Sequence, residues 1–170
     1  MNAAELAQKM KAFPGQWASG RLLADPHRQL ERVLEVWRAA AAGRVLPSYR
    51  ALGAVQLKAV LPDVHIYDVR PTPSRYVVRL IGTRMTEHLG AGMTGRPVAD
   101  FPVERLRDAI AGLLGVVEAS RAPLHLKAPR AVALPSGEHR SLESLWLPCG
   151  EDGETVDRII AVSLLGEDAL

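Results

Sequence analysis

The fold is decided by the stretch Asp63-Val-His-Ile-Tyr-Asp-Val-Arg70, a Pro-Thr-Pro-Ser turn, and Arg75-Tyr-Val-Val-Arg-Leu-Ile-Gly-Thr-Arg84. Its first apolar run, Val64 to Val69, is rich in β-branched and aromatic residues and predicts a strand. In the second run, Arg75 to Gly82, every second residue is apolar, which predicts another strand. We expect its drier face to carry Tyr76, Val78 and Leu80.

A short helix, Met85 to Leu89, and a loop rich in glycine follow this pair of strands. The loop, Gly90-Ala-Gly-Met-Thr-Gly95, matches the dinucleotide pattern G-x-G-x-x-G. That pattern binds pyrophosphate only between a strand and the start of a helix. Here a helix precedes it and Arg96-Pro97 follows, so we expect a helix cap and a tight loop without a nucleotide.

Two long helices are predicted, one on each side of this region. The first begins at Asp25-Pro26, because Asp caps free amides and Pro suits the first helical position. The second runs from Pro102 to Ser120 and has a broad apolar side. The first helix carries one apolar stripe with the spacing i, i+3, i+4, i+7, formed by Leu30, Val33, Leu34 and Trp37.

The apolar stripe of the first helix has two interpretations. It packs on the sheet of its own chain, or it pairs with the same helix of a second copy and forms a homodimer. One amphipathic face does not say which surface covers it, so both interpretations stay open.

Three further strands are predicted after the second long helix: Leu124 to Val132, Arg140 to Leu147, and Asp157 to Leu165. The last is apolar on both alternations, which is typical of a strand in the middle of a sheet. We therefore expect it to pair with Val64 to Val69. In the first of the three, Leu124 and Leu126 are expected to face inward, and His125 and Lys127 outward.

The domain organisation predicted from these patterns is simple. Residues 1–24 are poorly patterned and form an N-terminal extension, with an amphipathic turn at Leu6, Met10 and Phe13, and residues 25–170 form one domain. A short helix is expected from Ala54 to Val60.

Composition narrows the class of protein. The chain has 170 residues, 48% apolar and 24% charged, with a net charge of +2, as in an ordinary globular domain. Its lysines and arginines form no basic stripe, so we expect no nucleic-acid partner. The longest run of small apolar residues, Ala109 to Val117, is too short to cross a membrane. The single cysteine, Cys149, suits a reducing cytoplasm.

Short motifs accompany this order of elements: Trp37, Gly43, Leu46-Pro47, Leu61-Pro62, Asp68, Arg79, Gly82-Thr83, Gly90, Thr94-Gly95-Arg96 and Leu147-Pro148. Together with the order of elements, they resemble a PAS domain, and in particular a family of bacterial single-domain PAS-like proteins, over residues 26–166. The resemblance implies an α+β fold: a five-stranded antiparallel sheet, with its final strand beside the first, and flanking helices. It also implies a sensory or interaction module in signalling.

Five residues are candidates for binding a ligand between sheet and helices: Arg79, Arg84, His88, Glu143 and Trp146. Glu143 and Trp146 are three residues apart on one predicted strand, so they point to opposite faces. An inward Glu143 would need a ligand or a partner such as Arg79 or Arg84. His88 lies where some PAS domains bind haem, although a lone histidine on a polar helix is more often a surface residue.

The main interpretation is therefore a cytoplasmic PAS-like module that is not an enzyme. It would act through a signalling partner or as a homodimer. The alternatives are a hydrolytic enzyme using the same pocket, and a partner-binding protein whose pocket is filled by side chains. No cofactor is identified by the motifs. No metal site is expected, because the histidines lack metal-ligand spacing and the one cysteine is isolated.

Overall fold

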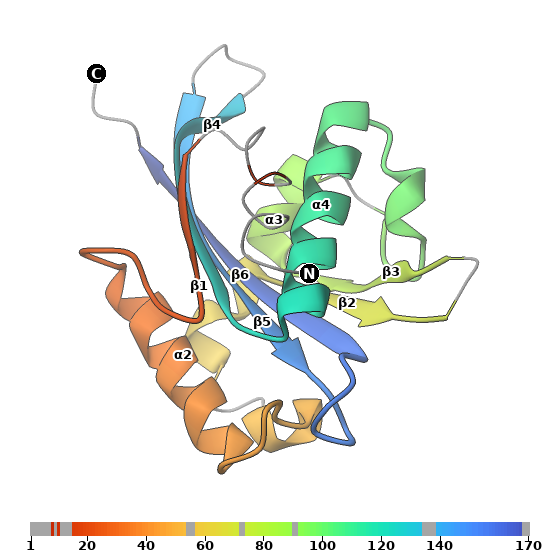
Figure 1. Cartoon of the computed structure of the whole chain (residues 1–170). Helices are drawn as coiled ribbons and strands as arrows, with labels where there is room; N and C mark the ends of the chain where they lie inside the picture. The colour runs from red at the N-terminus through yellow and green to blue at the C-terminus, as the bar shows by residue number, and fades with distance from the viewer. Residues whose placement is uncertain are drawn as a thin grey trace.

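A six-stranded antiparallel sheet lies at the centre of the protein, in the strand order β1-β4-β5-β6-β2-β3 (Figure 1). The computed structural model describes residues 8, 10, 15–53, 57–71, 74–89, 92–133 and 139–167. The strands are β1 (Gln16–Ser19), β2 (Val64–Val69), β3 (Tyr76–Ile81), β4 (Leu124–Ala133), β5 (His139–Cys149) and β6 (Arg158–Glu167).

The last strand, β6, is central, as its two apolar faces predict. It pairs with β5 on one side and with β2 on the other. Ala161 is therefore opposite both Trp146 of β5 and His65 of β2. The pairing of β6 with β2 brings residues about ninety or more positions apart in sequence into direct contact.

The strand β1 corrects the predicted strand count from five to six. It lies in the stretch assigned to the N-terminal extension and pairs with β4 from Gln16–Lys127 to Ser19–Leu124. Four residues are too few to show an alternation in sequence, so only the neighbouring strand reveals them as β. Of the expected N-terminal turn, Leu6 and Phe13 lie outside the described residues, whereas Met10 is buried.

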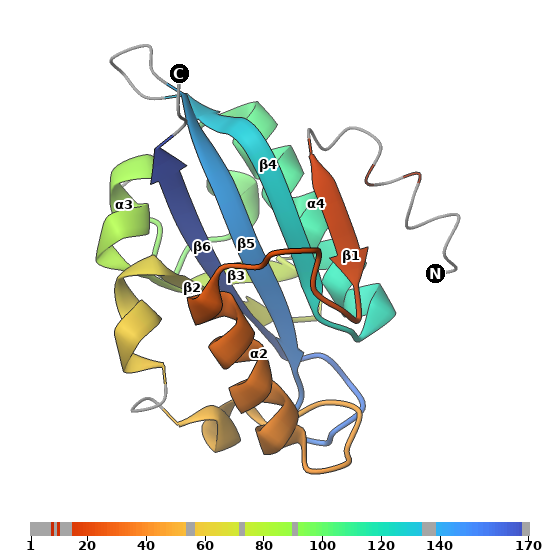
Figure 2. The ribbon, with the colours of Figure 1, turned by 90° about the vertical axis from the view of Figure 1, so that its left-hand side faces the viewer.

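Helices cover both faces of the sheet. The helices α3 (Thr83–Leu89) and α4 (Glu104–Ser120) lie on one face, here called the α4 face, and α2 (Arg28–Ala41) lies on the other, the α2 face (Figure 2). Three short 3-10 helices complete the fold: η1 (Tyr49–Leu52), η2 (Lys58–Asp63) and η3 (Val98–Asp100). The predicted helix from Ala54 to Val60 is in part η2, and residues 54–56 lie outside the described residues.

The start of α2 differs from the prediction. Asp25 does not cap the helix, because it adopts a left-handed conformation with φ 48° two residues before the cap. The N-cap is His27, whose ring Nδ1 accepts a hydrogen bond from the backbone N of Gln29. A histidine cap is not among the usual signals, so the sequence pattern favoured the nearby aspartate.

The apolar stripe of α2 is buried within its own chain. Leu30, Val33, Leu34 and Trp37 all belong to the core, and α2 packs against β5. The core interpretation therefore describes these four residues. A homodimer remains a proposal and would have to use other surface.

The strand β3 keeps only part of its expected alternation. Ile66 pairs with Leu80 and Tyr67 pairs with Val78, so Arg79 is an extra residue in β3. This bulge changes the phase of the side chains, and Leu80, expected on the dry face, is 39% exposed. The following short helix is α3, as predicted.

Candidate functional site

Five polar or aromatic side chains gather on the α4 face of the sheet and form what we call the buried polar cluster. Its members come from three adjacent strands: His65 and Tyr67 from β2, Ser144 and Trp146 from β5, and Ser163 from β6. Alternate residues of a strand share a face, and Ser144 is directly opposite Ser163. The register of β5, β6 and β2 therefore brings all five side chains together.

Four of the five residues form one continuous chain of hydrogen bonds. Tyr67 OH is 2.8 Å from His65 Nδ1, and His65 Nε2 is 2.7 Å from Ser163 Oγ. Ser163 Oγ is in turn 2.8 Å from Ser144 Oγ. All four residues are buried. Hydrogen bonds between these four side chains thus replace the hydrogen bonds to water that the groups lose on folding.

Trp146 is the fifth member, and its indole N–H has no acceptor. Nε1 is the one buried side-chain nitrogen or oxygen without a hydrogen-bond partner among the described residues. The ring stacks on Tyr67, with centroids 5.9 Å apart, and meets the edge of His65 at 5.2 Å. A buried donor without a partner costs about 1–3 kcal/mol, so this nitrogen is the most unusual polar atom of the described core.

The cluster is electrically neutral. Burial lowers the pKa of His65 to about 3, so its ring is uncharged at neutral pH. Burial also raises the pKa of Tyr67, so the phenol keeps its proton. Each of the four hydrogen-bonded groups therefore carries one hydrogen that it can donate.

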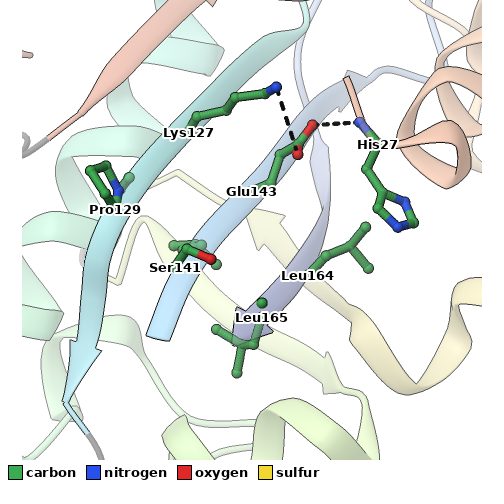
Figure 3. Close-up of a pocket in the computed structure, with 10 residues that line it drawn as sticks. His27, Lys127, Pro129, Ser141, Glu143, Leu164 and Leu165 are labelled. Atoms are coloured by element: carbon green, nitrogen blue, oxygen red, sulfur yellow. Dashed lines mark hydrogen bonds and ion pairs between the residues drawn. The ribbon is translucent and has the colours of Figure 1, made fainter. Parts of the chain in front are cut away.

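A second polar group lies on the opposite, α2 face of the sheet. Glu143 Oε1 accepts hydrogen bonds from the backbone N of His27 at 2.7 Å and from His125 Nε2 at 3.0 Å. Glu143 Oε2 lies 3.9 Å from Lys127 Nζ (Figure 3). The carboxylate thereby attaches the start of α2 to strands β4 and β5.

His125 corrects an expectation. Its side chain does leave the α4 face, as the alternation of β4 requires, but it is fully buried. The segment before α2 covers it, and the backbone N of Leu23 donates to His125 Nδ1 at 2.9 Å. Because Nδ1 accepts, Nε2 carries the hydrogen given to Glu143. Burial lowers the pKa of His125 more than Glu143 raises it, which favours the same neutral form.

A groove of about 390 Å³ lies beside Glu143 on this face (Figure 3). Both ring nitrogens of His125, which contacts Glu143, already have partners. His125 therefore has no free nitrogen that would take a proton from Ser141 in the groove. The other residues that line it include Pro129, Leu142, Leu164 and Leu165.

The predicted ligand-binding residues are not brought together. Arg79 lies 3.6 Å from Asp68, and Arg84 lies 2.6 Å from the carboxylate of Asp63. Neither contacts Glu143, whose partners are on β4 and before α2. Trp146 is in the buried polar cluster, on the opposite face from Glu143, as their spacing predicts. The side chain of His88 lies outside the described residues.

Four members of the buried polar cluster are not among the residues predicted from the sequence: His65, Tyr67, Ser144 and Ser163. A signal exists for His65, Tyr67 and Ser163, because each is a polar residue in a run of otherwise buried apolar residues, whereas Ser144 follows the polar stretch of β5. Such polar residues require partners, but the sequence does not say which strands supply them.

Other site chemistry is limited. Cys149 is buried, and burial raises the pKa of its thiol to about 12, so the thiol stays protonated. Over the described ranges, no three His, Cys, Asp or Glu side chains are placed to hold a metal ion. No helix in the described part of the chain is long and apolar enough to cross a membrane.

Comparison with known proteins adds the family. No curated protein matches the chain. Among solved structures, the PAS domain of an HTR-like protein from Haloarcula marismortui is 18% identical with a TM-score of 0.37, over 66% of this chain and 90% of that one. A sensory box histidine kinase/response regulator from Burkholderia thailandensis is 14% identical with a TM-score of 0.39, over 68% and 86%. A LOV protein from Rhodobacter sphaeroides is 16% identical with a TM-score of 0.39, over 82% and 68%.

At these identities and TM-scores, the three structures do not indicate a function for this protein. The family model described as PAS domain, in contrast, matches residues 26–163, which is most of the chain. The antiparallel sheet, its central last strand and the helices on its faces agree with that match. The protein therefore belongs to the PAS domain family.

Proposed function

We propose that this protein is a sensor that binds a small ligand between its sheet and the helices α3 and α4, at the buried polar cluster. PAS domains are sensory signalling modules and are typically not catalytic. The observation that supports a ligand here is the buried Trp146 Nε1, which has no acceptor among the described residues. A ligand atom would supply the missing acceptor and recover the free energy that the orphaned donor costs.

The setting we propose is cytoplasmic bacterial signalling without catalysis. The bound state would be passed to a protein partner or between two copies of the chain. A homodimer through α2 would use the exposed side of that helix, because its apolar stripe packs on the sheet. That side carries charged residues of both signs, Glu31, Arg32, Glu35 and Arg38, which suits a self-complementary contact.

Native mass spectrometry of the protein purified from cells tests the proposal. We expect a defined excess mass that is released on denaturation, together with the oligomeric state. Trp146→Phe should lose most of this mass, because it removes the donor and retains an aromatic ring. Trp17→Phe is the matched control, since Trp17 lies outside the cluster and should keep the ligand. A wild-type protein that carries no ligand and gains no thermal stability from a metabolite library would contradict the proposal.

A further inference from the structure

The four hydrogen-bonded residues of the buried polar cluster have more donatable hydrogens than there are hydrogen bonds between them. Tyr67, neutral His65, Ser163 and Ser144 bring one donatable hydrogen each, which makes four. Three hydrogen bonds join these groups. Each hydrogen bond uses one hydrogen. In every arrangement, therefore, one of the four hydrogens is not donated to another member of the cluster.

The hydrogen that is not donated always belongs to a hydroxyl group. If His65 donates from Nδ1, the spare hydrogen is on Tyr67. If His65 donates from Nε2, it is on Ser144 or Ser163. All three hydroxyls share the α4 face with Trp146: Tyr67 stacks on its ring, Ser144 is two residues away on β5, and Ser163 is opposite Ser144.

Trp146 Nε1 is a second donor without an acceptor in the same cluster. The two donors lie on one patch of sheet, and no acceptor for them is found among the described residues. A bound acceptor would therefore satisfy two groups at once, whereas a ligand that only donates would leave both of these hydrogens without an acceptor.

The absence of charge in the buried polar cluster disfavours a charged ligand. The ring of His65 is neutral, and no member of the buried polar cluster carries a charge. Among the described side chains, the buried ones that α3 and α4 contribute to this core are apolar as well, namely Met85, Ile110, Leu113, Leu114, Val116 and Val117. A carboxylate or an ammonium group placed here would lose its water without gaining a counter-ion from any of these described residues.

We propose that the ligand is a small uncharged molecule with a hydrogen-bond acceptor, such as a carbonyl oxygen, which accepts from Trp146 Nε1 and from the spare hydroxyl. This inference rests on the proposed function and specifies the chemistry of the same site. The competing occupant is a buried water, which also accepts two hydrogen bonds.

Three probes of nearly equal shape separate these classes: acetophenone, which has a neutral carbonyl; α-methylstyrene, which replaces that oxygen by a methylene group; and benzoate, which is charged. The readout is the indole N–H resonance of Trp146 in ¹H–¹⁵N spectra of the full chain. Trp146→Phe assigns this resonance by its loss. If that variant does not fold, Trp17→Phe and Trp37→Phe assign it by elimination.

We expect acetophenone to shift the Trp146 indole resonance saturably, and α-methylstyrene and benzoate to leave it in place. Trp146→Phe should bind acetophenone about tenfold more weakly, as the loss of one buried hydrogen bond predicts. Equal shifts with α-methylstyrene would overturn the acceptor requirement, and a preference for benzoate would overturn the uncharged class.

Results that contradict the proposed ligand class do not by themselves contradict the proposed sensor function. A ligand retained in native mass spectra, combined with no preference for acetophenone, would reject the ligand class and keep the sensor. An indole N–H that shows a cross-peak to a bound water and responds to no probe, in a protein that carries no ligand, would reject both.

Discussion

The indole Nε1 of Trp37 donates a 2.7 Å hydrogen bond to the backbone carbonyl of Pro148, 111 residues further along the chain. The bond joins the last residue of the apolar stripe of α2 to the end of β5. Trp37 is buried at this contact and is the largest residue of the stripe. The helix is thus attached to the sheet by packing and by a specific polar contact at the same point.

Replacing Trp37 by Ala should lower the free energy of unfolding by about 3–5 kcal/mol, because a large buried side chain is lost. Trp37→Phe should cost less, since the ring remains and mainly the bond to the Pro148 carbonyl is lost. Urea unfolding measures both, and sedimentation checks the mass. Wild-type stability in Trp37→Ala would mean that the α2 stripe is not core.

Acid should destabilise the protein through His65. Its pKa in the folded protein is lowered to about 3, against an ordinary 6.5, because burial disfavours the charged ring. The unfolded chain therefore binds a proton that the folded chain refuses, so this stability is complete above pH 6.5 and falls as the pH drops toward 3. The loss is up to about 1.4 kcal/mol per pH unit.

Chemical unfolding between pH 4 and 8 checks this slope, with His65→Asn removing the titrating group. The control is His27→Asn, which also removes a histidine but leaves a residue that caps helices well. Carboxylates titrate alike in all three proteins, so the difference isolates His65. The same acid slope in His65→Asn as in wild type would contradict the assignment.

Glu143 should act as a structural acceptor for the segment before α2. Glu143→Ala leaves the N–H groups of His125 Nε2 and the His27 backbone without their acceptor and should cost about 1–3 kcal/mol. Glu143→Gln retains an acceptor oxygen and should cost clearly less. Thermal and urea unfolding compare the two. Equal losses would show that the charge near Lys127, rather than the hydrogen bonds, matters here.

Gly82 lies where the chain passes very close to η2. A Cβ at this position would collide with the backbone carbonyl oxygens of Leu61 and Pro62, which side-chain rotation cannot relieve. Gly82→Ala should therefore destabilise the fold by about 1–3 kcal/mol or more. Gly112→Ala is the matched control, because it lies within α4 with open space around it and should be stabilising by up to about 1 kcal/mol. Similar effects of the two substitutions would contradict the close approach.

Local patterns were sufficient where one element carries its own signal. The double apolar alternation of Asp157 to Leu165 predicted a central strand, observed as β6, because only a strand covered on both faces can bury both sets of side chains. The spacing from Leu30 to Trp37 predicted one buried helical face. The spacing of Glu143 and Trp146 likewise placed them on opposite faces of β5.

Patterns failed where a second segment decides the outcome. His125 is buried because the backbone of Leu23, about a hundred residues earlier, covers it. The strand β1 is recognisable only through its pairing with β4. Leu80 is exposed because a bulge in β3 reverses the alternation. None of these features is encoded in the local period of the residues concerned.

The sequence by itself determined the class of the fold, the central position of the last strand and the buried face of α2, because burial imposes a period on consecutive residues. Only the tertiary structure decided the candidate site. His65, Tyr67, Ser144, Trp146 and Ser163 meet because the registers of β5, β6 and β2 align them on one face. That alignment depends on hydrogen bonds between strands far apart in the chain, which no local pattern specifies.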